Sequence, residues 1–193
     1  MLALHGRGAT AQGVVNLLDP VYRHGTTFLA PDAHHSRWYP HAATAPRERN
    51  EPDLSSAIAV VDALVNHATS TFRVDRDHVV LTGFSQGATV AAEYALANPT
   101  RYGGVAILSG TALDPDTTNE TAVDGGFANT PVLLATGDDD PHVPTERIHA
   151  TADAFTALDA TVDVQIAESV GHEITDDVLE RVGELVEDAR EDR

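Results

Sequence analysis

Short apolar runs alternate with longer amphipathic stretches along this chain, and the alternation predicts strands that are joined by helices. A short continuous apolar run is typical of a strand buried on both faces, as in a parallel sheet. The six runs that we interpret as strands lie within Leu2 to Leu4, Thr27 to Ala30, His78 to Gly83, Val105 to Leu108, Val132 to Ala135 and Val162 to Ile166.

Apolar residues recur at helical spacing between these runs. One helix is expected to begin near Pro52, since proline is favoured in a first turn. The expected helices run from about Ala11 to Leu18, from near Pro52, from Gln86 to about Asn98, from roughly Glu146 to Leu158, and from near Ile174 into the acidic tail. Residues 111–130 show weak periodicity and are expected to form a loop.

Strands that alternate with helices in this way predict a three-layer α/β fold with a mostly parallel sheet of six or seven strands. The length suits one domain over residues 1–193, because a chain of this size can bury a single sizeable core. Ligands of such sheets bind at the carboxyl ends of the strands. The residues directly after each strand are therefore the candidates for chemistry.

The composition narrows the chemistry that those residues can perform. The chain has no cysteine, and its twelve Lys and Arg residues are all arginine, which excludes thiol nucleophiles, disulfides and Schiff-base lysines. A formal net charge of −18 opposes binding to nucleic acids or anionic lipids. We interpret this excess of carboxylates as the adaptation of a halophilic protein to high salt, which screens their mutual repulsion.

Gly83-Phe84-Ser85-Gln86-Gly87 matches the Gly-x-Ser-x-Gly pattern of a nucleophile at a sharp strand-to-helix turn. The bare pattern is weak evidence, but here it lies between a predicted buried strand and a helix rich in small residues. Such a turn needs glycines because its strained backbone leaves little room for side chains. We predict Ser85 as the nucleophile, in preference to a serine that merely caps the helix.

A serine nucleophile needs a base, and the base needs a carboxylate that orients it. His172 is the candidate base because it follows the last predicted strand and precedes the last helix. Three aspartates follow the preceding strand, and we choose Asp140 because it begins a rigid turn with two prolines; Asp138 is the alternative. The order Ser, Asp, His along the chain is that of the α/β-hydrolase triad.

The loop His5 to Gly8 follows the first strand and is expected to supply one backbone N–H of an oxyanion hole. The two donors that we predict are the amides of Arg7 and Gln86, of which Gln86 directly follows the nucleophile. Trp38 and Tyr39 come after the second strand, and we expect them to wall the substrate pocket.

Four blocks of the chain resemble the signature segments of the phospholipase/carboxylesterase family, which lies close to the acyl-protein thioesterases and dienelactone hydrolases. The blocks are Leu4 to Ala9, Gly83 to Ala88, Gly137 to Pro144 and Gly171 to Ile174, and the similarity covers nearly the whole chain. The resemblance implies an α/β-hydrolase fold, and it supports Asp140 because the family's acid precedes a Pro-x-Val-Pro step. The family's usual leading strand is missing or shortened here, and a serine nucleophile argues against a dienelactone substrate.

The resemblance implies a cofactor-free serine carboxylesterase that hydrolyses short- or medium-chain esters. Three alternatives stay open: an acyl thioesterase or lysophospholipase with the same site, a non-catalytic relative that binds a small ligand, and a metal-dependent hydrolase that uses the loop histidines and would be inhibited by chelators. We expect no metal, because the adjacent His34 and His35 lack a helical histidine pair with a nearby carboxylate.

No segment approaches the ~20 apolar residues of a membrane span, and no export signal opens the sequence, so we expect a cytoplasmic protein. The sequence allows a homodimer but does not determine the oligomeric state.

Overall fold

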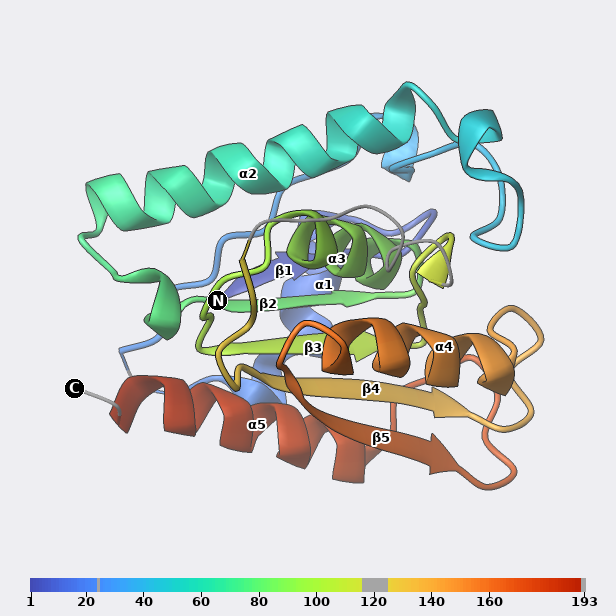
Figure 1. Ribbon diagram of the computed structural model, residues 1–193. Helices are drawn as coiled ribbons and strands as arrows, with labels where there is room; N and C mark the ends of the chain where they lie inside the picture. Colours follow the sequence, from blue (N-terminus) through green and yellow to red (C-terminus); the bar gives the residue numbers. More distant parts are fainter. Residues whose placement is uncertain (24, 116–124, 192–193) are drawn as a thin grey trace.

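The computed structural model describes residues 1–23, 25–115 and 125–191, and these residues form one five-stranded sheet (Figure 1). The strands are β1 (Leu2–Leu4), β2 (Val80–Phe84), β3 (Gly104–Leu108), β4 (Pro131–Gly137) and β5 (Thr161–Ala167). Neighbouring strands follow chain order and all pair in parallel. The carboxyl ends of all five strands therefore meet at one edge of the sheet.

Helices cover both faces of the sheet, as the three-layer prediction requires (Figure 1). On one face lie α2 (Asp53–Thr71), α3 (Gln86–Ala97) and α4 (Thr145–Thr156), and on the other lie α1 (Ala11–Leu17) and α5 (Asp176–Glu191). Two clusters of buried apolar side chains match these two layers. Short 3-10 turns occupy Asp19–Val21, His34–Ser36, Arg47–Arg49 and Arg76–His78.

The predicted second strand, Thr27 to Ala30, is not a strand in the structure. Leu29 makes a single parallel bridge to Leu2, in which its carbonyl oxygen accepts from the Ala3 N–H and its own N–H donates to Met1, each at 2.9 Å. The next position that would donate to β1 is residue 31, a proline without an N–H, so the ladder ends there. The described residues thus form five strands, not the predicted six or seven.

The other predicted elements lie close to the observed ones, with shifts that local structure explains. The strand β2 begins at Val80, later than expected, because residues 76–78 form a 3-10 turn. Residues 116–124 of the predicted loop lie outside the described residues, and the described part of residues 111–130 contains no α-helix or strand. No helix in the described part of the chain combines the length and apolar character needed to cross a membrane.

Candidate active site

Ser85 lies at the turn between β2 and α3, with backbone angles (φ 54°, ψ −117°) that residues other than glycine rarely adopt. The turn requires the glycines on either side. A Cβ atom on Gly83 would lie 2.4 Å from the carbonyl carbon of Gly87, and one on Gly87 would lie 2.3 Å from the carbonyl oxygen of Leu4. This close packing holds Ser85 at the carboxyl edge of the sheet.

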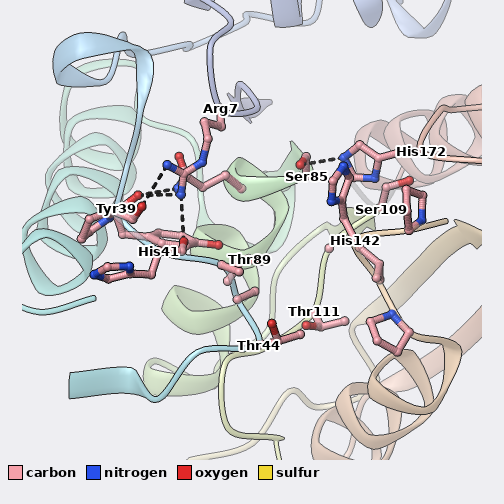
Figure 2. A pocket seen from close by; sticks show the side chains of 18 residues that line it. Arg7, Tyr39, His41, Thr44, Ser85, Thr89, Ser109, Thr111, His142 and His172 are labelled. Atoms are coloured by element: carbon pink, nitrogen blue, oxygen red, sulfur yellow. Dashed lines mark hydrogen bonds between the residues drawn. The ribbon is translucent and has the colours of Figure 1, made fainter. Parts of the chain in front are cut away.

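His172 follows β5, and its ring reaches the serine: Nε2 lies 2.8 Å from Ser85 Oγ (Figure 2). The ring lies against the rings of Phe84 (centroids 5.1 Å apart) and His142 (4.9 Å apart, nearly perpendicular). These contacts restrict its rotation. The side chain keeps 21% exposure, so water can approach it.

Asp140 follows β4, and its fully buried carboxylate accepts four hydrogen bonds. One oxygen, Oδ2, accepts from His172 Nδ1 (2.7 Å) and from Thr136 Oγ1 (3.2 Å). The other, Oδ1, accepts the N–H groups of His142 (2.8 Å) and Val143 (3.2 Å). Because the carboxylate accepts from Nδ1, the other ring nitrogen of His172 is the one that can take a proton from Ser85.

The neighbouring carboxylates point elsewhere. Asp138 is exposed, and its Oδ1 accepts the N–H of Ser169 at 2.6 Å, which fixes the turn after β5. Asp139 is exposed as well. The structure therefore brings Ser85, His172 and Asp140 into one hydrogen-bonded series and leaves Asp138, the alternative acid, outside it.

The two residues predicted to supply oxyanion donors lie close to Ser85. Arg7 belongs to the turn after β1, where a Cβ atom on Gly6 would lie 3.4 Å from Ser85 Cβ. Gln86 is the first residue of α3, and an N–H at this position has no partner within the helix. Both residues border the same cavity as Ser85.

A cavity of about 550 Å³ opens beside Ser85 and His172 (Figure 2). Its wall combines the turn after β1 with segment 39–44, the turn after β3 and the turn after Asp140. No carboxylate is among the described residues that line it, although Asp and Glu account for 30 of the 193 residues. The lining therefore does not oppose negative charge on a bound group.

Tyr39 lines this cavity as expected, whereas Trp38 does not. The indole N–H of Trp38 donates to the carbonyl oxygen of His5 at 2.8 Å, and the two rings lie 5.0 Å apart. The expectation that Trp38 walls the pocket is thus wrong, because its N–H finds a buried partner in the core. Burial raises the pKa of Tyr39 to about 12, so its hydroxyl, paired with Thr89, stays protonated at neutral pH.

His142 and the turn Ser109 to Thr111 also line the cavity, although neither was predicted from the sequence to belong to the site. His142 contributes an N–H to Asp140 and a ring to His172. His142 comes after the carboxyl end of β4, and the turn Ser109 to Thr111 comes after the carboxyl end of β3. Position after a strand was therefore the signal that could have located them.

A parallel sheet with a strained serine turn after an inner strand and a histidine after the last strand defines an α/β hydrolase. The model of the phospholipase/carboxylesterase family matches residues 1–188. The chain belongs to this family, and both activities in the family's name hydrolyse ester bonds.

Solved structures agree with this assignment. A phospholipase/carboxylesterase from Dyadobacter fermentans is 30% identical, with a TM-score of 0.87 over 96% of this chain and 88% of that one. A variant of SOBER1 from Arabidopsis thaliana, 21% identical, shares the fold with a TM-score of 0.80 over 98% and 99% of the two chains.

A curated relative matches part of the chain. The putative esterase NocK of Nocardia uniformis subsp. tsuyamanensis is 35% identical over 105 residues, which are 54% of this chain. The match spans 29% of that esterase, well under half its length.

Proposed function

We propose that this protein is a serine carboxylesterase that hydrolyses short- or medium-chain carboxylic esters through Ser85, His172 and Asp140. The observation that carries the proposal is the unbroken series of hydrogen bonds from Ser85 Oγ to His172 Nε2 (2.8 Å) and from His172 Nδ1 to Asp140 Oδ2 (2.7 Å). The series begins at a strained turn and borders a cavity. It has the geometry of a nucleophile, a base and an orienting acid.

The reaction proceeds in two steps. Ser85 Oγ attacks the ester carbonyl while His172 Nε2 takes its proton, and the tetrahedral intermediate collapses as His172 protonates the departing alcohol. Water then attacks the acyl-enzyme and loses a proton to His172, which returns that proton to Ser85 Oγ as the bond to the serine breaks and the carboxylic acid leaves. Asp140 holds the ring in the required tautomer through both steps.

The backbone N–H groups of Arg7 and Gln86 donate hydrogen bonds that stabilise the negative charge of each tetrahedral intermediate. Donors of this kind stabilise the transition state by about 3 to 4 kcal/mol each. The absence of carboxylates among the described lining residues supports this role, since a nearby anion would oppose the oxyanion.

The size of the cavity supports an ester of short or medium chain length. About 550 Å³ lies within the usual range for small-molecule sites, roughly 300 to 1,000 Å³. The lining mixes hydroxyl groups with proline, alanine and valine side chains, which suits an acyl chain next to a polar reacting centre. A chain-length series of p-nitrophenyl esters, run beside matching acyl thioesters, measures this preference.

Two substitutions at neighbouring aspartates test the proposal. We expect Asp140→Asn to lower kcat by roughly 10³- to 10⁴-fold, because the histidine loses its orienting acceptor. Asp138→Asn makes the same chemical change two residues away, at a carboxylate bonded to Ser169, and should keep near-normal activity. Equal losses in both variants would contradict the assigned acid.

Labelling with a fluorophosphonate probe tests the nucleophile directly. The wild-type chain should label at one site, and Ser85→Ala should neither label nor turn over ester while unfolding at a similar temperature. A Ser85→Ala variant that still hydrolyses p-nitrophenyl butyrate would refute the mechanism.

A further inference from the structure

The backbone carbonyl oxygen of Tyr39 joins the two residues that supply the proposed oxyanion amides. It accepts Nε2 of Gln86 at 2.7 Å and Nη2 of Arg7 at 3.0 Å. A carbonyl oxygen has two lone pairs, so these two donors satisfy it completely. Arg7 and Gln86 are 79 positions apart in the sequence and belong to different elements, yet their side chains meet at one atom.

The contact with Gln86 is buried and specific. Gln86 is 5% exposed, and both polar atoms of its side-chain amide are engaged: Oε1 accepts the backbone N–H of Trp38 at 2.8 Å, while Nε2 donates to the carbonyl oxygen of Tyr39. A primary amide thus bonds to backbone groups of two consecutive residues, the N–H of Trp38 and the carbonyl oxygen of Tyr39. Because Gln86 also begins α3, this side chain ties the first turn of the helix to the cavity wall.

The guanidinium of Arg7 binds residues 39–41, which overlap this segment. Besides Tyr39, it donates to the carbonyl oxygens of Pro40 (3.0 Å) and His41 (2.8 Å), as Figure 2 shows. Three successive carbonyl oxygens therefore converge on one side chain. Because each bond orients the guanidinium, the backbone of residue 7 is held as well.

We propose that the side chains of Gln86 and Arg7 are positioning residues, which hold the two oxyanion amides at a fixed separation through the Tyr39 carbonyl oxygen. This inference rests on the proposed esterase function. Each residue then has two roles: its N–H faces the reacting oxygen, and its side chain helps to fix the Arg7 amide relative to the Gln86 amide at the start of α3.

The physical reason is that an oxyanion hole works only when its donors are in place before the charge develops. A displacement of about 1 Å can cost on the order of 100-fold in rate. The amide of Gln86 is fixed by α3, but that of Arg7 lies in a turn after the short strand β1. A shared anchor supplies the rigidity that a turn by itself lacks.

Kinetics of three variants test the proposal with p-nitrophenyl butyrate as substrate. Gln86→Met keeps a similar side-chain length but removes the donor, and Arg7→Met keeps an unbranched apolar side chain but removes the guanidinium. Each should lower kcat by roughly 10- to 100-fold while KM changes less than about threefold, because the loss falls on the transition state. The double variant should lose far less than the product of the two single losses, because both act through one atom.

Inhibition by an alkyl trifluoromethyl ketone separates positioning from general structural damage. Such a ketone forms a hemiketal oxyanion on the nucleophile, so its inhibition constant should rise in each variant in proportion to the fall in kcat. Thermal unfolding, measured in parallel, shows whether the fold is intact. Arg7 is exposed, so its variant tests the proposal even if Gln86→Met fails to fold.

Two control variants replace a glutamine and an arginine by methionine at positions outside the site. Gln12→Met removes an exposed amide that donates to Asn16 Oδ1 on α1, and Arg101→Met removes an arginine that donates to the carbonyl oxygens of Ala128 and Asn129. Both should keep wild-type kcat and the wild-type inhibition constant.

Three results would overturn the inference. One is an unchanged kcat in both single variants, and another is a fully multiplicative loss in the double variant. The third is a fall in kcat without a matching rise in the inhibition constant. Failure of the underlying function looks different, since the wild-type chain and Ser85→Ala would then show the same negligible turnover.

Discussion

At the scale of single residues, the fold stabilises one strained backbone conformation and several buried phenol groups. Ser85 has a positive φ of 54°, a conformation that costs on the order of 1 to 3 kcal/mol and persists only when its surroundings enforce it. Three tyrosines are buried enough that desolvation raises the pKa of each phenol: Tyr39, Tyr94 and Tyr102. In Tyr102 the neighbouring Tyr94 adds to the effect of burial.

The raised pKa of Tyr39 predicts a loss of stability at alkaline pH. The pKa is about 12 in the folded chain and about 10 in an unfolded one, so between these values the folded state binds more protons. The free energy of unfolding should therefore fall across this window as pH rises, by up to about 1.4 kcal/mol per pH unit for this tyrosine.

Urea denaturation at pH 9, 10 and 11 measures this slope. Tyr39→Phe should show a shallower decline than the wild-type chain, while Tyr22→Phe, a change at an exposed tyrosine, should leave the slope unchanged. Parallel declines in the wild-type and Tyr39→Phe chains would contradict the prediction.

At the scale of elements, glycines decide how closely α3 approaches the sheet. A Cβ atom on Gly87 would lie 2.3 Å from Leu4 O and 2.6 Å from His5 O, so the helix begins in direct contact with the end of β1. Gly13 in α1 differs, because a Cβ atom there would meet only Thr10 Oγ1 at 3.4 Å and Ala9 Cβ at 4.0 Å. Glycine is therefore required for close packing at the start of α3, whereas in α1 a larger residue fits in its place.

The same substitution should therefore have opposite effects in the two helices. Gly87→Ala should destabilise the fold by roughly 2 to 4 kcal/mol, because backbone atoms must move apart. Gly13→Ala should stabilise it by about 0.5 to 1 kcal/mol, since alanine is the better helix former. Urea midpoints at neutral pH compare the variants, and a destabilised Gly13→Ala or a neutral Gly87→Ala would each contradict the prediction.

At the scale of the whole molecule, the acidic residues outnumber the arginines, which leaves a formal net charge of −18. Some arginines form ion pairs, such as Arg23 with Glu187 and Arg181 with Asp163, but 30 carboxylates face only 12 arginines. The folded chain therefore concentrates like charges, and their repulsion opposes compaction. Adaptation to high salt stays a prediction from this composition.

Salt should accordingly stabilise the fold. The Debye length shrinks from about 30 Å at 0.01 M to about 8 Å at 0.15 M salt, which screens repulsion across the surface. We expect Tm to rise by several degrees between 0.01 and 0.2 M KCl, given that about 1 kcal/mol shifts Tm by roughly 2 to 4 °C at this size. Sucrose of equal osmolarity does not screen charge and should have little effect, whereas a falling Tm in KCl would refute this account.

Local pattern predicted most of the elements but not their exact partners. Five of the six apolar runs are strands, because an uninterrupted apolar run has few other places to lie than a buried sheet. The sixth run, Thr27 to Ala30, is also short and largely apolar, yet it forms only one bridge. Further pairing would need an N–H at residue 31, and that residue is a proline. Trp38 was misplaced for a related reason: its position in the chain does not show that His5 accepts its N–H.

The sequence by itself determined the class of fold and the residue types at the strand ends, because periodicity and strand-to-turn order are properties of neighbouring residues. Which groups touch was decided only by the tertiary structure. Of three adjacent aspartates, Asp140 reaches His172 because the turn after β4 buries it and supplies two N–H donors to its other oxygen. The meeting of Arg7 and Gln86 at the carbonyl oxygen of Tyr39 likewise depends on three segments far apart in the chain, and no local pattern encodes such a contact.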